Sequence, residues 1–148
     1  MKRGAVAGLI LVCGYWTIAF AGQKPETLAG LKVQAAAAAP QQCVRLCAGV
    51  ARRALLEAKD QFEKGAYQEA RTALQDLTAY ADKAANAAIG SRKHEKELEI
   101  DLRDISHRLD ALKRDVSLED QAAVADAMSH LETLRTQLLQ SMFGKKKK

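Results

Sequence analysis

Cys43 and Cys47 are the residues of this sequence whose type and spacing most readily carry chemistry. They are four positions apart, so on a helix their side chains share one face, one turn from each other. Three interpretations stay open: a disulfide, a pair of inert thiols, or a site for soft-metal binding or thiol exchange, because thiolates favour copper(I) and zinc. A disulfide would distort the first turn of the helix, since this spacing places the Cα atoms near the upper limit of disulfide reach.

The three histidines do not add a recognisable site to this cysteine pair. His94, His107 and His130 are scattered over other predicted helices and do not form a spaced set of zinc ligands with the cysteines. No Glu is followed three positions later by His, the pattern found in di-metal helical bundles. Gly-rich phosphate loops and Gly-x-Ser-x-Gly elbows are also missing from the sequence. We therefore expect a protein that is not an enzyme and that uses no metal or cofactor.

A basic run, Lys145, Lys146, Lys147 and Lys148, follows the last predicted helix. Such a run can make weak contact with an anionic membrane or a cell-wall polymer, because each lysine near an anionic surface contributes about 1 kcal/mol. The alternative is a tail that only increases solubility. Nucleic acid is the less expected partner, because the first residues of the chain predict export.

Residues 1–21 have the composition of a secretory signal peptide. Lys2 and Arg3 precede an uncharged, mostly apolar run, and Ala19-Phe20-Ala21 has the small-x-small pattern of a cleavage site. The alternative is an uncleaved membrane anchor, although the apolar run is shorter than the roughly 20 residues that a spanning helix needs. We expect cleavage after Ala21 and export to the periplasm or the extracellular space. In such an oxidising compartment the two remaining cysteines can pair.

Composition favours helices in the rest of the chain. Aromatic residues make up only 5% of the sequence, so a core must be built mainly from Leu, Ile, Val and Ala, which favours helices over a β-sandwich. Both prolines, Pro25 and Pro40, precede residue 41, so long helices are allowed after it. The formal net charge of +5 is accounted for by the signal peptide and the basic run, and the body between them is nearly neutral.

Apolar residues recur at steps of three and four along four segments, which is the pattern of amphipathic helices. The segments are residues 41–64, 66–89, 92–114 and 118–143. Their similar lengths and short connections predict an all-α fold, an antiparallel up-down-up-down four-helix bundle. The alternatives are two helical hairpins, or a hairpin that completes its core by dimerising. In this domain organisation residues 22–40 are an Ala/Gln-rich linker, 41–143 the bundle and 144–148 the basic tail.

The stretch from Ala54 to Leu74 resembles one tetratricopeptide hairpin. The matching residues are Ala58, Phe62, Gly65, Tyr67, Ala70 and Leu74. The resemblance implies that the small residues let two helices pack closely and that the glycine makes the turn. No second copy follows at the period of that family, so its peptide-binding groove is not carried over. In type, the whole chain is also similar to small exported helical proteins of bacteria.

These observations predict an exported, non-enzymatic helical protein, a protein-interaction or structural module of the cell envelope. The partner is an unknown protein, and a homodimer is a further candidate. The contact surface that we expect is the alanine-rich end of the second predicted helix, which contains Ala81, Ala84 and Ala88. The alternatives are association with an anionic surface through the lysine run, and a thiol or metal protein centred on Cys43 and Cys47.

Overall fold

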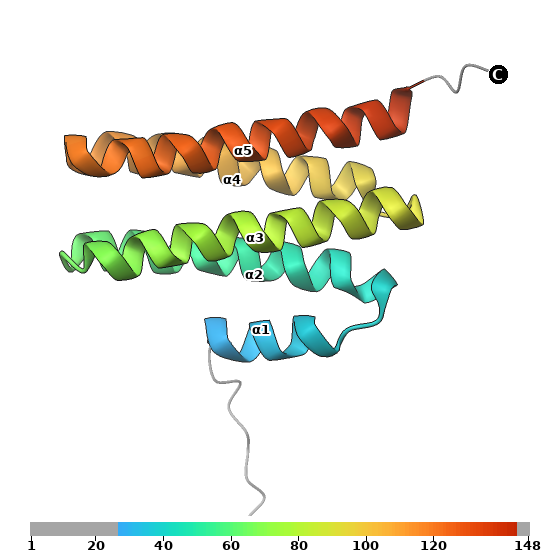
Figure 1. Ribbon diagram of the computed structural model, residues 1–148, viewed down its shortest axis with the longest axis horizontal. Coiled ribbons are helices and arrows are strands. Elements are labelled where there is room, and N and C mark those ends of the chain that lie inside the picture. The colour runs from blue at the N-terminus through green and yellow to red at the C-terminus, as the bar shows by residue number, and fades with distance from the viewer. Residues whose placement is uncertain (1–26, 145–148) are drawn as a thin grey trace, which may run out of the picture.

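The computed structural model describes residues 27–144, which are all-helical, as predicted (Figure 1). Within this range there are five α-helices and no β-strand. The helices are α1 (Leu28–Ala37), α2 (Pro40–Glu63), α3 (Tyr67–Ser91), α4 (Glu95–Asp115) and α5 (Leu118–Phe143). None of them is long and apolar enough to serve as a membrane span. The signal peptide predicted at residues 1–21, with its cleavage after Ala21, lies outside the described residues.

The expected count of four helices is wrong, because part of the predicted linker forms α1. Thr27 caps this helix by accepting a hydrogen bond from the Gly30 N–H at 3.2 Å. Leu31 and Ala35 are buried, so α1 packs its apolar side chains against the rest of the molecule. An ion pair between Lys32 and Asp76 of α3, with Nζ 2.5 Å from Oδ2, also holds it in place. The burial of these two side chains and the ion pair hold this segment as a helix, although its composition predicted a linker.

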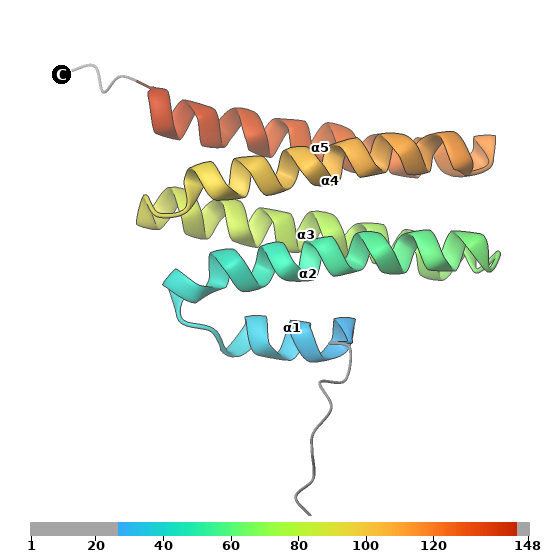
Figure 2. The ribbon, with the colours of Figure 1, turned by 180° about the vertical axis from the view of Figure 1, so that it is seen from behind.

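The helices are arranged in layers (Figures 1 and 2). Packing is most extensive between α2 and α3 and between α4 and α5. The second pair lies on the first through contacts of α3 with α5, α2 with α4, and α3 with α4, whereas the α2 and α5 backbones do not approach each other closely. Helix α1 packs on α2, on the side away from α4 and α5. Within the described range, α1 and the α4–α5 pair therefore cover opposite sides of the α2–α3 pair.

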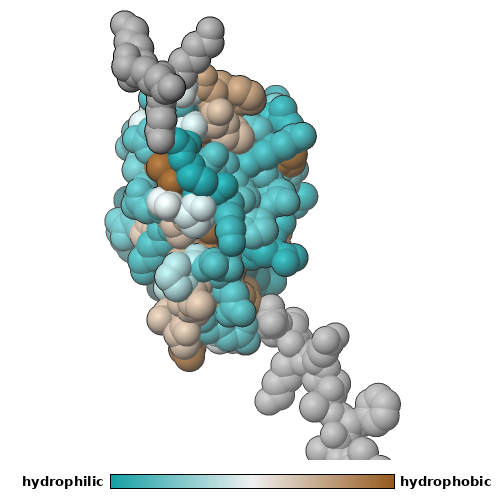
Figure 3. All heavy atoms as spheres, turned by 90° about the vertical axis from the view of Figure 1, so that its right-hand side faces the viewer, coloured by the Kyte–Doolittle hydropathy of each residue, from teal (hydrophilic) through white to brown (hydrophobic). Residues whose placement is uncertain are grey.

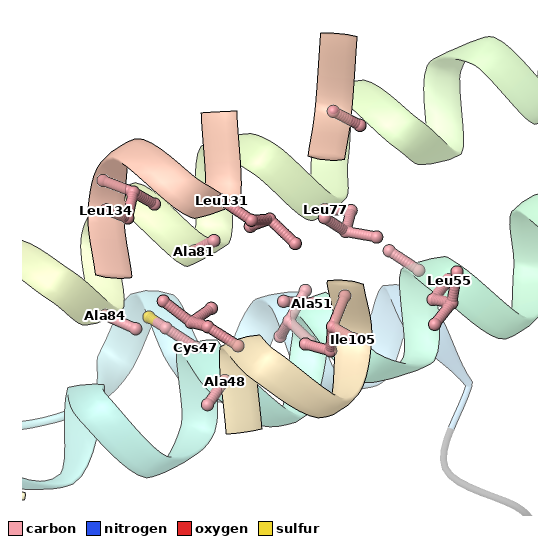
Figure 4. Packing of buried hydrophobic residues seen from close by; sticks show 14 of the residues in the cluster. Cys47, Ala48, Ala51, Leu55, Leu77, Ala81, Ala84, Ile105, Leu131 and Leu134 are labelled. Atoms are coloured by element: carbon pink, nitrogen blue, oxygen red, sulfur yellow. The ribbon is translucent and has the colours of Figure 1, made fainter. Parts of the chain in front are cut away.

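Alanine is the commonest buried residue of both α2 and α3, the two helices that pack most extensively. Ala51, Ala54 and Ala58 of α2 and Ala81, Ala84 and Ala88 of α3 are all 0% exposed. Their small side chains allow the two helix axes to approach closely. Leucines and Ile105 from α3, α4 and α5 fill the wider space between the two helix pairs (Figure 4).

The turn between α2 and α3 depends on Gly65, whose φ of +73° lies in the left-handed region. Any other L-residue is strained there, at a cost of roughly 1–2 kcal/mol. Gly49 provides a contrast, because it lies inside α2 and a Cβ placed on it would meet no atom within 4 Å. A glycine inside a helix destabilises it relative to alanine.

The substitutions Gly49→Ala and Gly65→Ala should therefore change stability in opposite directions. Gly49→Ala should raise the free energy of unfolding by about 0.5–1 kcal/mol. Gly65→Ala should lower it by about 1–2 kcal/mol, because alanine keeps the positive φ at a cost. Urea unfolding followed by circular dichroism measures both changes. Equal effects of the two substitutions would contradict this account of the turn.

A partly buried ion pair links the two helix pairs. The Arg71 guanidinium of α3 donates to Asp120 Oδ1 in the first turn of α5, from Nη2 at 2.8 Å and from Nε at 3.2 Å. The Ser117 hydroxyl donates to the other carboxylate oxygen at 2.8 Å. The hydrogen bond from Ser117 is the largest influence that holds the pKa of Asp120 below its usual value, and those from Arg71 act in the same direction. Burial of the carboxyl acts in the opposite direction.

Asp120→Asn should destabilise the protein at neutral pH by about 1–2 kcal/mol, because charge-assisted hydrogen bonds are lost. A carboxyl whose pKa is lowered on folding stabilises the fold above its unfolded pKa, and the contribution disappears as the pH falls through the folded pKa. The difference between wild type and variant should therefore shrink below about pH 4. Asp104→Asn is the control, since Asp104 forms an exposed pair with Arg108 and should change little at any pH. A difference for Asp120→Asn that stays constant between neutral and acidic pH would contradict this assignment.

Candidate functional site

The structure brings the two predicted thiols into contact. Cys43 and Cys47 lie in the first turns of α2, and their Sγ atoms are 3.1 Å apart. Both are free thiols, and they differ in exposure: Cys43 is partly exposed, while Cys47 is 1% exposed and lies close to Ala84 of α3 (Figure 4). One thiol of the pair is thus reachable from solvent and the other is enclosed by the fold.

This difference in burial separates the acidities of the two thiols. Burial raises the pKa of the Cys47 thiol to about 12, and the hydrogen bond with Cys43 acts in the same direction. The positive charge of Lys83 lowers the pKa of Cys47, but by less than burial raises it. Because the thiolate is the nucleophile and the metal ligand, Cys47 is protonated at neutral pH in the folded protein and is the slower of the two thiols to react with an external reagent.

Cys43 and Cys47 line a pocket of about 410 Å³ between α1, α2 and α3. One wall is formed where α1 meets α2, by Ala35 and Ala36 at the end of α1, Ala38 in the connection and Pro40 at the start of α2. Helix α3 contributes Tyr80, Lys83 and Ala87. The Lys83 ammonium lies 4.4 Å from the centre of the Tyr80 ring, so the aromatic face holds it beside the pocket. We call this space the thiol pocket.

The histidines do not join the thiols. His130 Nε2 lies 2.9 Å from Asp82 Oδ1 in a bridge from α5 to α3, and His94 contacts Glu97 in its own turn. His107 is exposed on α4. Across residues 27–144 no group of three or more His, Cys, Asp or Glu side chains is placed to hold a metal ion. A tetrahedral zinc site made of protein ligands therefore has too few donors at the thiol pocket.

The alanine-rich end of α3 is not the contact surface that we expected from the sequence. Ala81, Ala84 and Ala88 are completely buried against the neighbouring helices. Because the neighbouring helices approach closely there, these three alanine side chains are not exposed to a partner. The other predicted contact, Lys145 to Lys148, lies outside the described residues.

A second apolar feature, which the sequence analysis missed, lies where α2 and α4 end. Two adjacent pockets of about 170 and 200 Å³ share Lys59, Leu112 and Asp115. The remaining apolar lining residues are Leu55, Leu56, Phe62, Tyr67, Ala111 and Val116. We call the two pockets together the hairpin-end groove. The sequence signal for this groove was a set of large apolar residues that do not lie on the buried faces of their helices. Leu56 is 47% exposed and Tyr67 is 50% exposed.

The opposite end of the molecule differs in character. Viewed onto the end where α5 finishes, the surface is mostly hydrophilic, with small separate hydrophobic areas (Figure 3). Isolated apolar residues of this kind are normal on protein surfaces.

No known protein family matches this chain, and no curated protein or solved structure is significantly similar to it.

The two thiols should alkylate at different rates in the folded, reduced protein. Iodoacetamide near pH 8 should modify Cys43 on the order of tenfold faster than Cys47, because Cys47 is buried and protonated. Peptide mapping by mass spectrometry after a time course gives the two rates. In urea, where the burial is gone, the rates should become similar. Equal rates in the folded protein would mean that Cys47 is not enclosed as described.

Proposed function

We propose that this chain is an exported, non-enzymatic helical protein that acts through protein contacts, as an interaction or structural module of the cell envelope. The observation that carries the proposal is the hairpin-end groove, an apolar depression with large exposed apolar side chains beside it. The signal-peptide composition of residues 1–21 supports export.

For the architecture, we infer two stacked helical hairpins, α2–α3 and α4–α5, with α1 as a cover on the outer side of the first. In a ring-ordered up-down-up-down bundle the first and last helices are neighbours, and here the α2 and α5 backbones do not approach each other closely. The diagonal contact of α3 with α4 supports the same inference. The resemblance of residues 54–74 to a tetratricopeptide hairpin agrees with an α2–α3 unit of this kind. One such hairpin provides no basis for that family's peptide groove.

The groove fits an amphipathic helix of a protein partner. Helices α2 and α4 lie side by side (Figure 2), and a groove between two helices accepts the apolar face of a third. Its floor is apolar through Leu55 and Leu112, while Lys59 and Asp115 place both signs of charge at its edge. Each of the two pockets has the size for one or two apolar side chains, so neighbouring apolar side chains on one face of a helix can fill the pair.

Substitution at the edge of the groove should abolish partner binding without unfolding the protein. Leu56→Glu places a charge at the groove, whereas Ile100→Glu, on α4, is a control with closely similar exposure: 47% for Leu56 and 44% for Ile100. The free energy of unfolding of both variants should lie within about 0.5 kcal/mol of that of the wild type. Immobilised wild type and Ile100→Glu should retain the same envelope protein, and Leu56→Glu should lose it by at least about tenfold.

Two results would count against this function. Equal capture by Leu56→Glu and Ile100→Glu would show that the groove is not the contact site. If light scattering finds a wild-type dimer that Leu56→Glu dissociates, the groove binds a second copy of this chain and not a different protein.

A further inference from the structure

We propose that Cys43 and Cys47 form a thiol–disulfide exchange site that reacts with anionic small-molecule disulfides entering the thiol pocket. The proposal is independent of the hairpin-end groove, which lies at the other end of α2 and on the side of α4. It rests on three features of the pocket: the contact between the sulfurs, their unequal exposure and the lysine beside them.

The contact between the two sulfurs favours chemistry that needs two thiols and no third ligand. The Sγ atoms are 3.1 Å apart on one helix face, so neither side chain has to leave its helix for a bond to form. A metal that needs three or more protein ligands lacks the third donor at this place among residues 27–144. Forming and breaking a disulfide needs only these two residues and an external disulfide.

The position of the pair near the start of α2 lowers the cost of forming the disulfide. A disulfide between residues four apart draws the Cα atoms together at the limit of its reach. The distortion falls on the first turns of α2, where the Cys43 N–H makes the first regular hydrogen bond of the helix, to the carbonyl of the N-cap residue Ala39 at 2.9 Å. Backbone groups at a helix start are less fully bonded than those inside, so this end of α2 adjusts at a lower cost than its middle.

The unequal exposure assigns different roles to the two thiols. The partly exposed Cys43 is the thiol that an incoming disulfide reaches first, and the enclosed Cys47 is the thiol that completes the exchange. The Cys43 thiolate attacks one sulfur of the small disulfide, forms a mixed disulfide and releases one small thiolate. Cys47 then loses its proton and attacks Cys43 Sγ, which forms the intramolecular disulfide and releases the second small thiolate. The two protons of the cysteines end on the two released thiols, and the small disulfide is the two-electron oxidant.

The charge of the pocket selects the class of disulfide. Lys83 is the charged residue among the described side chains that line the pocket, and the other lining residues are alanines, Pro40, Tyr80 and the two thiols. Its ammonium attracts a ligand with carboxylates and also favours the small thiolates that leave. A disulfide with negative charge, such as glutathione disulfide, therefore fits better than a neutral one.

The first experiment follows the exchange by mass spectrometry. The protein carries Cys13→Ser, so that Cys43 and Cys47 are its only thiols. The reduced protein is mixed with glutathione disulfide, the reaction is quenched with acid, and the mass of the product is measured. We expect an intramolecular disulfide without attached glutathione. Cys47→Ser should keep glutathione on Cys43, and Cys43→Ser should react on the order of tenfold more slowly. Stable glutathione adducts on the parent protein, disulfide-linked dimers or no reaction would each overturn the proposal.

The second experiment tests the role of Lys83 as a positioning residue. Lys83→Gln should slow the reaction with glutathione disulfide by about threefold to fivefold, and should leave the rate with neutral 2-hydroxyethyl disulfide unchanged. Lys64→Gln, an exposed residue just beyond the far end of α2, is the control and should change neither rate. The rate with glutathione disulfide should also fall with added salt in the parent protein but not in Lys83→Gln. Equal rates of Lys83→Gln and its parent with glutathione disulfide would overturn the selection of anionic disulfides.

Discussion

The close approach of α2 and α3 is the contact on which the rest of this structure depends. Alanine is the commonest buried residue in both helices, and eight of these alanines are 0% exposed. Small side chains bury little area each, so this contact stabilises the pair less than a leucine seam of equal length. Its consequence is geometric: the two helices present one continuous surface on each side. Helix α1 covers part of one side, and the leucine-rich α4–α5 pair covers the other.

The burial of Cys47 follows from the same contact. A cysteine is one of the few side chains small enough to lie where α2 and α3 are so close, and Ala84 is its neighbour (Figure 4). Cys43, one turn earlier, is nearer the helix start and stays partly exposed. The docking of α1 then turns an open surface beside the thiols into a pocket with Lys83 in its wall. Reactivity at this place is thus a result of packing as much as of residue type.

The two candidate sites differ in chemistry and in position. The thiol pocket lies between α1 and the α2–α3 pair, whereas the hairpin-end groove lies between α2 and α4, where these helices end. The first holds two nucleophiles and one cation, and the second is an apolar groove with charges of both signs at its edge. No side chain lines both. Binding at the groove and exchange at the thiols can therefore be separated by substitution.

Local residue patterns alone were enough to predict the four long helices, the end of one of them at Gly65 and the shared helix face of Cys43 and Cys47, because periodicity and backbone preference act over a few residues. The docking of α1, the burial of the alanine-rich end of α3 and the groove beside Leu56 were decided by tertiary structure. An apolar stripe specifies which face of a helix is buried but not which helix covers it. Leu31 and Ala35 became buried, and Leu56 stayed exposed, because of the neighbours that the fold placed beside them.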